Sequence, residues 1–487
     1  MSGQSLWLGI LLLADLALFG GAVYFAVESF REEESRAPRV GVGMALGAML
    51  LGALIIWVPG SRVPMTVAVA LGAIFGLLLF VPGKPDARAL EGAKGAIAGE
   101  PVRHDERDIP FARLRSVPPG SEAYRAYYAM HPEREAEDAR RREKGLLGEM
   151  GRIDKGYRPN VAMMEAAFDM PHFLGPFARN APGEGSTPAE ISPTRATEIV
   201  KNLALHNGAD AVGICRVNPL WMYSHRGEIF YDRWEEWGKE LDPEAFPPYA
   251  VVMLTEMNKD HVWGAPHTPT VAESATGYAR GAYLSTILAR WFAHMGYRGI
   301  AENTRNYDLA MPPLAVDAGL GEIGRLGYLI APRFGARVRV FATLTDMPLI
   351  PDKPISIGAD AFCERCRKCA ESCPSRSIPP GDKEIYNGAL KWKLNAETCF
   401  EYWSRVGTDC SICMAICPFS RPDTALHRVV RWFVARSPLA RRVFPYVDNA
   451  LYGKRWRSRR APSWLDYPKG KEAHREVYGG KDAESMG

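Results

Sequence analysis

Eight of the chain's nine cysteines fall within one C-terminal stretch and form two closely spaced runs. The first run, C-x2-C-x2-C-x3-C-P, contains Cys363, Cys366, Cys369 and Cys373. The second run, C-x2-C-x3-C-P, contains Cys410, Cys413 and Cys417, and Cys399 precedes it. This spacing is typical of proteins with two [4Fe–4S] clusters, because a tight loop directs three thiolates at one cluster and a distant cysteine supplies the fourth. The sequence therefore predicts two [4Fe–4S] clusters.

The assignment of cysteines to clusters follows the pattern of two-cluster ferredoxins, in which the last cysteine of each run binds the other run's cluster. That pattern assigns one cluster to Cys363, Cys366, Cys369 and Cys417, and the other to Cys373, Cys399, Cys410 and Cys413. Zinc is the alternative metal, but two Cys-Pro endings are typical of iron–sulfur sites. The ninth cysteine, Cys215, is expected to be a buried apolar residue.

Three apolar runs open the 487-residue chain, over residues 6–27, 40–58 and 65–81. Each is close to the roughly 20 residues that cross a bilayer as a helix. No lysine, arginine or twin-arginine pair precedes the first run, so a cleaved signal peptide is not expected. We expect three transmembrane helices, with two spans and an interfacial hairpin as the alternative. Asp15 interrupts the first run and is either a bundle contact, part of a quinone or proton site, or a tolerated polar residue.

Basic residues in the short loops predict the orientation of these helices. Arg31, Arg36 and Arg39 lie in the first loop, whereas the second loop holds only Arg62. Positively charged loops stay in the cytoplasm. The large C-terminal part should therefore face the cytoplasm. The formal net charge of +4 is too small to indicate a nucleic-acid partner.

Patterning beyond the transmembrane region (1–83) divides the rest of the chain into four parts. Residues 84–191 form a linker and N-terminal arm, and 192–352 alternate strands with helices, which predicts an α/β core. The expected strands are 209–216, 249–254 and 338–344, and the expected helices are 194–208 and 273–296. Residues 353–423 hold the cysteine runs. The basic tail, 424–487, interleaves arginines with aromatic residues, which predicts either contact with the anionic inner leaflet or helices that pack back on the protein.

A glycine pattern, Gly319-x-Gly321-x-x-Gly324, matches the dinucleotide-binding fingerprint. That fingerprint should follow a strand. Here it follows residues 311–318, which contain two prolines and predict a loop leading into a helix. We therefore favour a turn at which the backbone approaches another large cofactor, with nicotinamide binding as the alternative.

Five further segments occur in an order that resembles the cobalamin-dependent reductive dehalogenases, over roughly residues 192–423. They are GYARGAY (277–283), AGLGEIGRLGYLI (318–330), FGARVRV (334–340), TDMPL (345–349) and FCERCRKCAESCPSRSI (362–378). The resemblance implies a nitroreductase-like α/β core that binds cobalamin, with a ferredoxin-like two-cluster domain. It also implies a base-off corrinoid, in agreement with the lack of a D-x-H-x-x-G pattern, and a reaction that replaces halogen by hydrogen on a small organohalide.

The same resemblance assigns roles to individual residues. Tyr278 matches the family's proton donor, and its phenolate needs a nearby cation to be stable at neutral pH. Arg339 is the preferred cation and Arg337 the alternative. Asn306 matches an asparagine that lies near the substrate. Ser274, one helical turn before Tyr278, matches a family position at the cofactor, which the glycines at 319, 321 and 324 are also expected to approach.

The chain departs from the family's commonest pattern, in which an exported enzyme uses a separate membrane anchor. Its fused apolar runs predict a multi-pass protein of the bacterial inner membrane that contacts lipid, with electrons from quinol or a soluble low-potential carrier. One alternative is a corrinoid enzyme acting on tRNA, similar to epoxyqueuosine reductase, although that family uses an aspartate as its acid. The other is a non-enzymatic membrane iron–sulfur subunit, which would leave residues 192–349 without a purpose.

Overall fold

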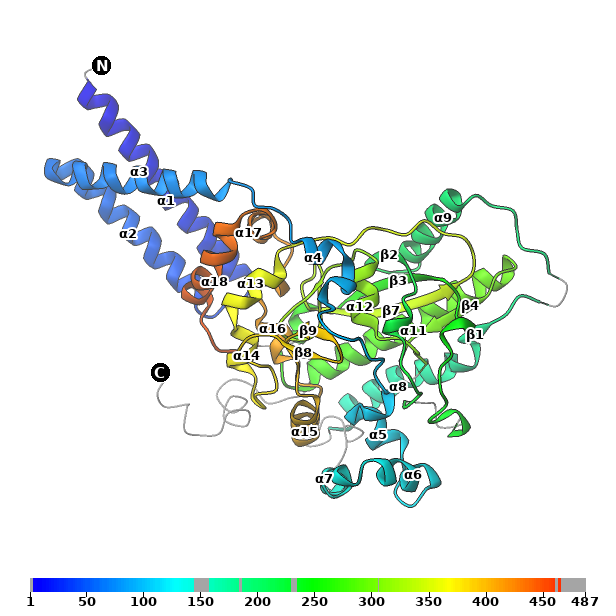
Figure 1. Ribbon diagram of the computed structural model, residues 1–487. Coiled ribbons are helices and arrows are strands. Elements are labelled where there is room, and N and C mark those ends of the chain that lie inside the picture. The colour runs from blue at the N-terminus through cyan, green and yellow to red at the C-terminus, as the bar shows by residue number, and fades with distance from the viewer. Residues whose placement is uncertain are drawn as a thin grey trace. The chain divides into compact units, whose positions relative to one another are not determined.

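The structure is a computed structural model that describes residues 3–143, 157–183, 186–228, 234–304, 306–459 and 463–465 (Figure 1). Its central feature is a five-stranded sheet in the order β1-β4-β7-β3-β2. The strands are β1 (Arg179–Asn180), β2 (Ala211–Arg216), β3 (Tyr249–Glu256), β4 (Gly299–Glu302) and β7 (Val338–Thr345). Each neighbouring pair of these strands is antiparallel.

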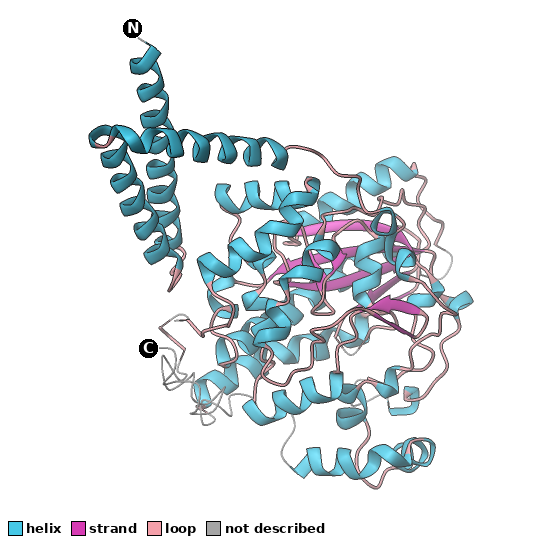
Figure 2. Cartoon of the chain, turned by 60° about the vertical axis from the view of Figure 1, so that its left-hand side comes forward, coloured by secondary structure: helices cyan, strands magenta, loops and turns pink. Residues whose placement is uncertain are grey.

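Helices cover both faces of this sheet, as Figure 2 shows with the strands in magenta. Alternate residues of β3 point to opposite faces. Val251 and Met253 pack with α9 (Pro193–His206) and α11 (Thr268–His294), whereas Val252 packs on the face covered by α12 (Met311–Asp317). Burial on both faces explains why β3 is a continuous apolar run instead of an alternating one.

The predicted α/β core is confirmed, with one difference in detail. The three expected strands form within two residues of their expected bounds, and helix 194–208 is observed as α9. Helix α11 begins at Thr268, five residues before the predicted start at 273. Its first turn contains Pro269, which is favourable at that position because it has no amide hydrogen to leave unpaired.

The cysteine segment follows the sheet and is built from short helices and tight turns. It contains α13 (Ala359–Cys366), α14 (Lys368–Ser372), β8 (Glu384–Tyr386), β9 (Ala389–Lys391), α15 (Ala396–Val406) and α16 (Ile412–Ile416). Arg367, Cys410 and Ser411 have positive φ angles of 52°, 62° and 56°. These left-handed residues turn the chain sharply between the cysteines, as a cluster-binding loop requires.

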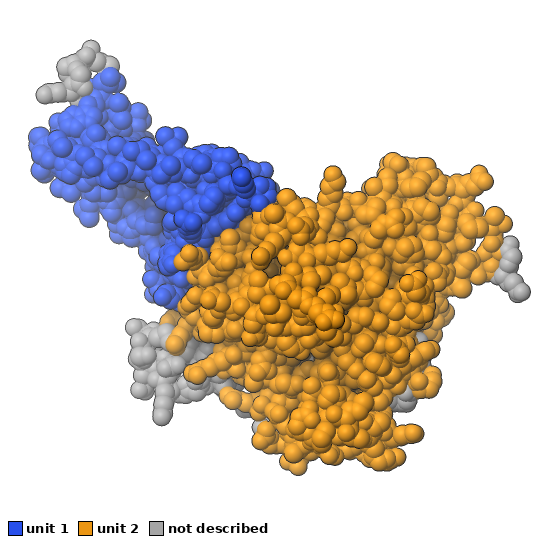
Figure 3. All heavy atoms as spheres, in the orientation of Figure 1, with its two compact units in different colours: residues 1–85, 422–454 blue, residues 86–421, 455–487 orange. Residues whose placement is uncertain are grey.

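The chain divides into two units, coloured separately in Figure 3. The helical unit comprises Met1–Pro85 and Pro422–Lys454, and the core unit comprises Asp86–Arg421 and Arg455–Gly487. In the helical unit, α1 (Gly3–Arg31), α2 (Ala37–Trp57) and α3 (Arg62–Leu79) are long and apolar enough to cross a membrane. The three predicted apolar runs are therefore helices, as expected.

Helices α1 and α2 approach closely because small residues lie between them. A Cβ atom on Gly41 would lie 2.8 Å from the Cβ of Ala26, and one on Gly52 would lie 2.6 Å from a carboxylate oxygen of Asp15. Small residues of this kind are typical of helix contacts in membranes. Gly52 thus makes room for the carboxylate of Asp15, which lies at the α1–α2 contact.

Helices α17 (Ala425–Arg436) and α18 (Pro438–Tyr452) belong to the helical unit, although they follow the cysteine segment in sequence. They contact the N-terminal apolar helices through aromatic pairs such as Phe80–Phe433 and Phe25–Tyr452. Of the two expectations for the basic tail, packing back on the protein therefore applies to these helices. Contact with lipid is compatible with that packing.

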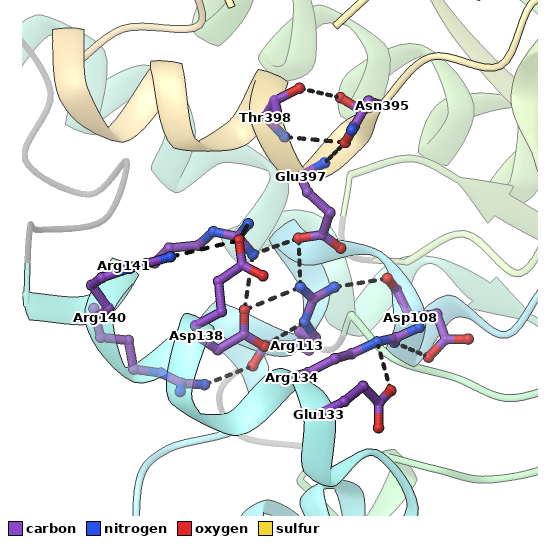
Figure 4. Close-up of polar contacts among 12 residues, drawn as sticks. Asp108, Arg113, Glu133, Arg134, Asp138, Arg140, Arg141, Asn395, Glu397 and Thr398 are labelled. Atoms are coloured by element: carbon purple, nitrogen blue, oxygen red, sulfur yellow. Dashed lines mark hydrogen bonds and ion pairs between the residues drawn. The ribbon is translucent and has the colours of Figure 1, made fainter.

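In the core unit, a buried ionic cluster joins the N-terminal arm to α15 (Figure 4). Arg113 of α5 (Pro110–Ser116) binds Asp138 of α7 (Pro132–Glu143) with Nε–Oδ2 2.6 Å, and binds Glu397 of α15 with Nη2–Oε2 2.7 Å. Arg141 bridges the same two carboxylates. Since α15 carries Cys399, the cluster fixes one cysteine helix to the arm.

The remaining elements of the core unit are short or peripheral. They are α4 (Ala87–Leu90), α6 (Glu122–Met130), α8 (Arg158–Leu174), α10 (Lys259–Val262), β5 (Glu322–Ile323) and β6 (Leu329–Ile330). Of these, α8 packs along α11 and covers its outer side.

Candidate active site and cluster site

Helix α11 crosses β7 at a short distance because it has glycine at two of the points of contact. A Cβ atom on Gly277 would lie 2.9 Å from Cγ of Arg339, and one on Gly281 would lie 2.1 Å from the ring of Phe341. Residues four apart share a helix face, and residues two apart share a strand face. The two glycines of the GYARGAY segment thus match two successive side chains of β7, and they bring Tyr278 next to Arg339.

Tyr278 and Arg339 are in direct contact. Nη1 of Arg339 donates a hydrogen bond to the phenol oxygen at 3.1 Å, and the guanidinium carbon lies 4.8 Å from the ring centroid. Burial by itself would lower the pKa of Arg339, but Tyr278 and Asp409 outweigh it and the pKa is raised. The guanidinium therefore stays charged, and a charged donor on the phenol oxygen favours the phenolate that remains after proton transfer.

Asp409 holds the other side of the Arg339 guanidinium. Its Oδ2 lies 3.1 Å from Nη2 of Arg339, and its Oδ1 accepts a hydrogen bond from Thr270 Oγ1 at 3.0 Å. The hydroxyl of Ser274 contacts both Asp409 and Arg339. Because Asp409 directly precedes Cys410, this network links the tyrosine site to a cysteine loop. Asp409 was not predicted as a site residue, because its only signal in the sequence is a charge beside a cysteine.

Arg337, the alternative partner of Tyr278, makes its described contacts elsewhere. Nε donates to the Ser420 carbonyl at 2.7 Å, and Nη1 donates to the Met257 carbonyl at 2.6 Å and lies 3.0 Å from a carboxylate oxygen of Glu256. Its side chain is 2% exposed. These contacts connect the end of β3 to the segment after the second cysteine run, so the geometry favours Arg339 as the partner of Tyr278.

Asn306 is buried in the turn that follows β4. Its side-chain amide donates to the Ala301 carbonyl at 2.7 Å, and its backbone pairs with Asn303. Asn303, a neighbouring amide, donates to Ser285 at 2.9 Å. The Asn306 side chain thus stabilises its own turn, and its contact with a substrate stays a prediction.

Two further tyrosines, which were not among the predicted site residues, lie near Tyr278. Burial raises the pKa of Tyr328 well above its usual value, with added contributions from the thiols of Cys399 and Cys413 and from Tyr278. Burial also raises the pKa of Tyr307, with contributions from Glu228 and Tyr278. Tyr328 is therefore a neighbour of both the proposed proton donor and the second cysteine set. It lies inside the AGLGEIGRLGYLI segment, so its place in that motif was the available signal.

The three glycines expected at the cofactor lie against the chain itself. Gly319 has a φ of 73°, and a Cβ atom there would lie 2.5 Å from the Lys353 carbonyl oxygen. At Gly321 the Cβ would lie 2.2 Å from the Ile330 carbonyl oxygen, and at Gly324 it would lie 2.4 Å from the Ile330 side chain. Close packing accounts for glycine at these positions, and contact with a cofactor stays a prediction.

The eight clustered cysteines fall into two electrostatic neighbourhoods. Burial raises the pKa of Cys363 well above its usual value, and the neighbours that add to the rise are Cys417, Cys369 and Cys366. Burial raises the pKa of Cys410 and of Cys413 in the same way, and Cys399 and Cys373 are among the neighbours of both thiols. Cys413 of the second set also contributes to the raised pKa of Cys369, so the two sets lie next to each other. Buried thiols of this kind ionise only when a bound metal compensates the charge. The grouping supports the interleaved ligand sets predicted from the spacing.

The second set surrounds a cavity that reaches the tyrosine site. All four of its cysteines line this cavity, together with Tyr328, Arg339 and Asp409. No three His, Cys, Asp or Glu side chains within the described ranges converge closely enough to hold a single metal ion. Four cysteines around one cavity match the four thiolates that a [4Fe–4S] cluster takes.

Polar atoms that fit a corrinoid or a halide lie beside Tyr278. Arg339 Nε and Thr255 Oγ1 are buried and have no hydrogen-bond partner within the described part of the chain. The two residues are paired across β3 and β7, and Thr255 also faces Gly277. Buried polar atoms are almost always hydrogen-bonded. Acceptors such as corrin amide oxygens or a departing halide would satisfy them, so the site is compatible with the cofactor that the motifs imply.

A buried acidic cluster lies at the end of β4, near Tyr307. Asp308 pairs with Arg179 at 2.6 Å and with Arg226 at 3.0 Å, and its backbone amide donates to Glu302 at 2.6 Å. Burial, followed by the charge of Asp308, raises the pKa of Glu302 to about 8. Glu302 is therefore mostly protonated at neutral pH.

Comparisons with known proteins agree with this geometry. A family model described as a 4Fe-4S dicluster domain matches residues 362–420. The tetrachloroethene reductive dehalogenase of Sulfurospirillum multivorans is 33% identical over 296 residues, which are 55% of this chain and 58% of that protein.

Two solved structures are similar over most of the chain. The catabolic reductive dehalogenase NpRdhA in complex with 3-bromo-4-hydroxybenzoic acid is 25% identical with a TM-score of 0.57, covering 81% of this chain and 54% of that one. A reductive dehalogenase structure described as suggesting a mechanism for B12-dependent dehalogenation is 26% identical with a TM-score of 0.56, covering 80% and 54%. The chain thus spans slightly more than half the length of these relatives. In sequence and in fold the chain is thus similar to reductive dehalogenases, and its residues 362–420 match a 4Fe–4S dicluster domain.

Proposed function

We propose that this protein is a reductive dehalogenase that replaces halogen by hydrogen on a small organohalide. The balanced reaction is R–X with two electrons and one proton, giving R–H and halide. The observation that carries the proposal is the contact between Tyr278 and Arg339 beside a cavity lined by four cysteines. This contact supports a role for Tyr278 as a proton donor next to a source of electrons, and the reaction needs both.

The proposed cofactors are two [4Fe–4S] clusters and a base-off cobalamin. The interleaved sets Cys363, Cys366, Cys369, Cys417 and Cys373, Cys399, Cys410, Cys413 would hold the clusters. Ser274, Gly319, Gly321 and Gly324, with Arg339 Nε and Thr255, would line the corrinoid. A bound cobalamin supplies a low-potential cobalt that can react at a carbon–halogen bond.

The chain's own residues then handle the proton. Tyr278 donates its phenolic proton to the carbon that loses halogen. The charge of Arg339 stabilises the phenolate that remains, because an adjacent cation favours the ionised form of an acid. Asp409 and Ser274 hold the guanidinium in place, and Asn306 orients the substrate or the tyrosine.

The helical unit suggests where electrons enter and where the enzyme resides. We propose a multi-pass protein of the bacterial inner membrane, with its core unit in the cytoplasm, as the arginines of the first loop favour. The electron donor is then either quinol at α1–α3 or a soluble low-potential carrier. A reporter fused after Gly487 should give a cytoplasmic signal, and a periplasmic signal would overturn this orientation.

The two alternative functions fit these observations less well. An enzyme of the epoxyqueuosine reductase type would use an aspartate as its acid, whereas Tyr278 fills that position here. A non-enzymatic electron-transfer subunit would have no use for a tyrosine held by Arg339 and Asp409 beside the cysteines.

Halide release tests the proposed activity. The full chain, purified without oxygen and loaded with cobalamin and iron–sulfur clusters, would be incubated with reduced methyl viologen and either tetrachloroethene or 3-bromo-4-hydroxybenzoic acid. We expect one halide released for every two electrons consumed. If the fully loaded protein released no halide from either compound or from a wider panel of chloro- and bromoarenes and haloalkenes, the proposal would be wrong.

A further inference from the structure

Helices α17 and α18 expose one continuous set of basic and apolar side chains, which we call the interfacial face. Its residues on α17 are Arg428, Val429, Trp432 and Arg436, and its residues on α18 are Arg442, Tyr446 and Val447. The apolar members are well exposed, from 42% for Trp432 and Val447 to 61% for Tyr446. Such large exposed apolar side chains on a helix that already packs against the protein indicate a second contact.

The spacing of this face follows the helical repeat. Arg428, Trp432 and Arg436 are four residues apart, as are Arg442 and Tyr446, so each group forms one stripe along its helix. The guanidinium of Arg436 lies 4.7 Å from the Trp432 ring. Basic residues beside Trp, Tyr and Val are typical of helices that lie in the plane of a membrane surface. There the apolar groups enter the acyl boundary while the guanidinium groups stay at the headgroups.

An adjoining side of these helices is fixed to the apolar helices, and Trp432 lies where that side meets the interfacial face. The Phe80 ring at the end of α3 lies 6.1 Å from Trp432 and 5.0 Å from Phe433. The Gly83 amide donates to the Arg436 carbonyl at 2.8 Å. Within the last two turns of α1, Phe25 lies 5.9 Å from Tyr452. The interfacial face is thus anchored directly to candidate membrane spans.

These anchor points all lie at one end of the three apolar helices. Helix α1 ends at Arg31, α2 begins at Ala37 and α3 ends at Leu79, so these points share one membrane surface if each helix spans once. Glu32 lies at this end and pairs with His427 of α17 at 3.1 Å, with both side chains buried. The contact places α17 at the level where the apolar helices leave the membrane.

We propose that the interfacial face binds the headgroups of anionic phospholipids in the leaflet around this end of α1–α3. Charge complementarity selects this occupant, since Arg428, Arg436 and Arg442 are exposed on the face and no acidic residue belongs to it. Trp432 and Tyr446 are side chains that favour the membrane–water boundary. The inference does not depend on the catalytic activity. It requires only that the apolar helices span a bilayer.

Lipid retention by the intact protein tests the inference. The full chain would be reconstituted in bilayers with equal amounts of phosphatidylglycerol and phosphatidylcholine, released into mild detergent, and examined by native mass spectrometry. We expect the protein to retain phosphatidylglycerol selectively. Attraction to anionic lipid amounts to a factor of roughly five per arginine near the surface. The triple variant R428Q/R436Q/R442Q should therefore lose at least tenfold in selectivity.

Two control variants and a competition with inorganic phosphate make the outcome decisive. The variant R140Q/R195Q/R216Q removes three exposed arginines of the core unit and should keep the selectivity of the unmodified protein. The charge-conserving variant R428K/R436K/R442K should also keep most of it, which separates loss of charge from misfolding. Unchanged selectivity in the glutamine variant would overturn the proposal. Displacement of the lipid by millimolar inorganic phosphate would also overturn it, because it would indicate a site for free anions.

Discussion

The guanidinium of Arg339 lies against the phenol of Tyr278, with Nη1 3.1 Å from the phenol oxygen and the guanidinium carbon 4.8 Å from the ring centroid. The contact exists because Gly277 leaves room for the Arg339 stem beneath α11. A phenol ordinarily holds its proton at neutral pH, with a pKa of about 10. An adjacent fixed cation is the simplest device for making it a proton donor.

Replacing Tyr278 by phenylalanine should leave both types of cofactor bound while turnover falls by about 10²- to 10⁴-fold, the usual contribution of a general acid. The rate would be followed by halide release, and cofactor content by visible absorption and metal analysis. Tyr283 is a matched control on the same helix, because its exposed hydroxyl binds Asn207 instead of Arg339. Y283F should remain active, and full activity of Y278F would remove Tyr278 from the mechanism.

The two arginines near β7 should respond differently to substitution. Arg339→Gln should reduce turnover, because the phenolate left by Tyr278 loses its cation. Arg337→Gln should instead reduce stability, by about 3 kcal/mol, because buried carbonyls of Met257 and Ser420 lose a charged donor. Thermal unfolding and halide release measured on both variants distinguish the roles. A stable, inactive R337Q variant would mean that the two assignments are reversed.

Cysteine substitutions test the interleaved cluster sets. Cys417→Ser should damage the cluster held mainly by the first run, whereas Cys413→Ser should damage the other cluster. Each variant should keep about four of roughly eight iron atoms per chain. Electron paramagnetic resonance of the reduced proteins would show a different single cluster in each. If both variants lost the same signal, each run would bind its own cluster.

Stability should fall between acidic and mildly alkaline pH because of Glu302. Burial raises the pKa of Glu302 to about 8, whereas a glutamate in the unfolded chain has a pKa of about 4.3. The folded state therefore binds a proton that the unfolded state releases, so this contribution is complete below pH ~4.3 and is lost as pH rises to about 8. Glu302→Gln, which is always neutral, should resist this loss. Melting curves from pH 5 to pH 9 that run parallel for the two proteins would contradict this account.

Features set by local spacing were predictable from the sequence. The cysteine loops depend on residues three or four apart, and the long apolar strands β3 and β7 depend on a continuous pattern. By contrast, the contact between Arg339 and Asp409 joins residues 70 positions apart and arises only from packing. The short strands β1 and β4 carry too few residues to show an alternating pattern.

For α17 and α18, the sequence predicts two different sides of each helix but does not predict which side the protein covers. The amphipathic pattern of α17 and α18 is the same whether a helix faces lipid or protein. The fold shows that these helices use one side for Phe80 and Phe25 and leave the arginine-rich side exposed. Sequence periodicity identifies the two sides, but only the tertiary contacts tell which side the protein covers.

The most direct test of the central claim is the metal and corrinoid content of the purified full chain. A corrinoid enzyme fed by two [4Fe–4S] clusters should contain about one cobalt and about eight iron atoms per chain, with the cobalt extractable as a corrinoid. This measurement does not depend on knowing the organohalide. Protein that binds eight iron atoms but no cobalt, even when folded in the presence of cobalamin, would contradict the proposal and favour a membrane electron-transfer subunit.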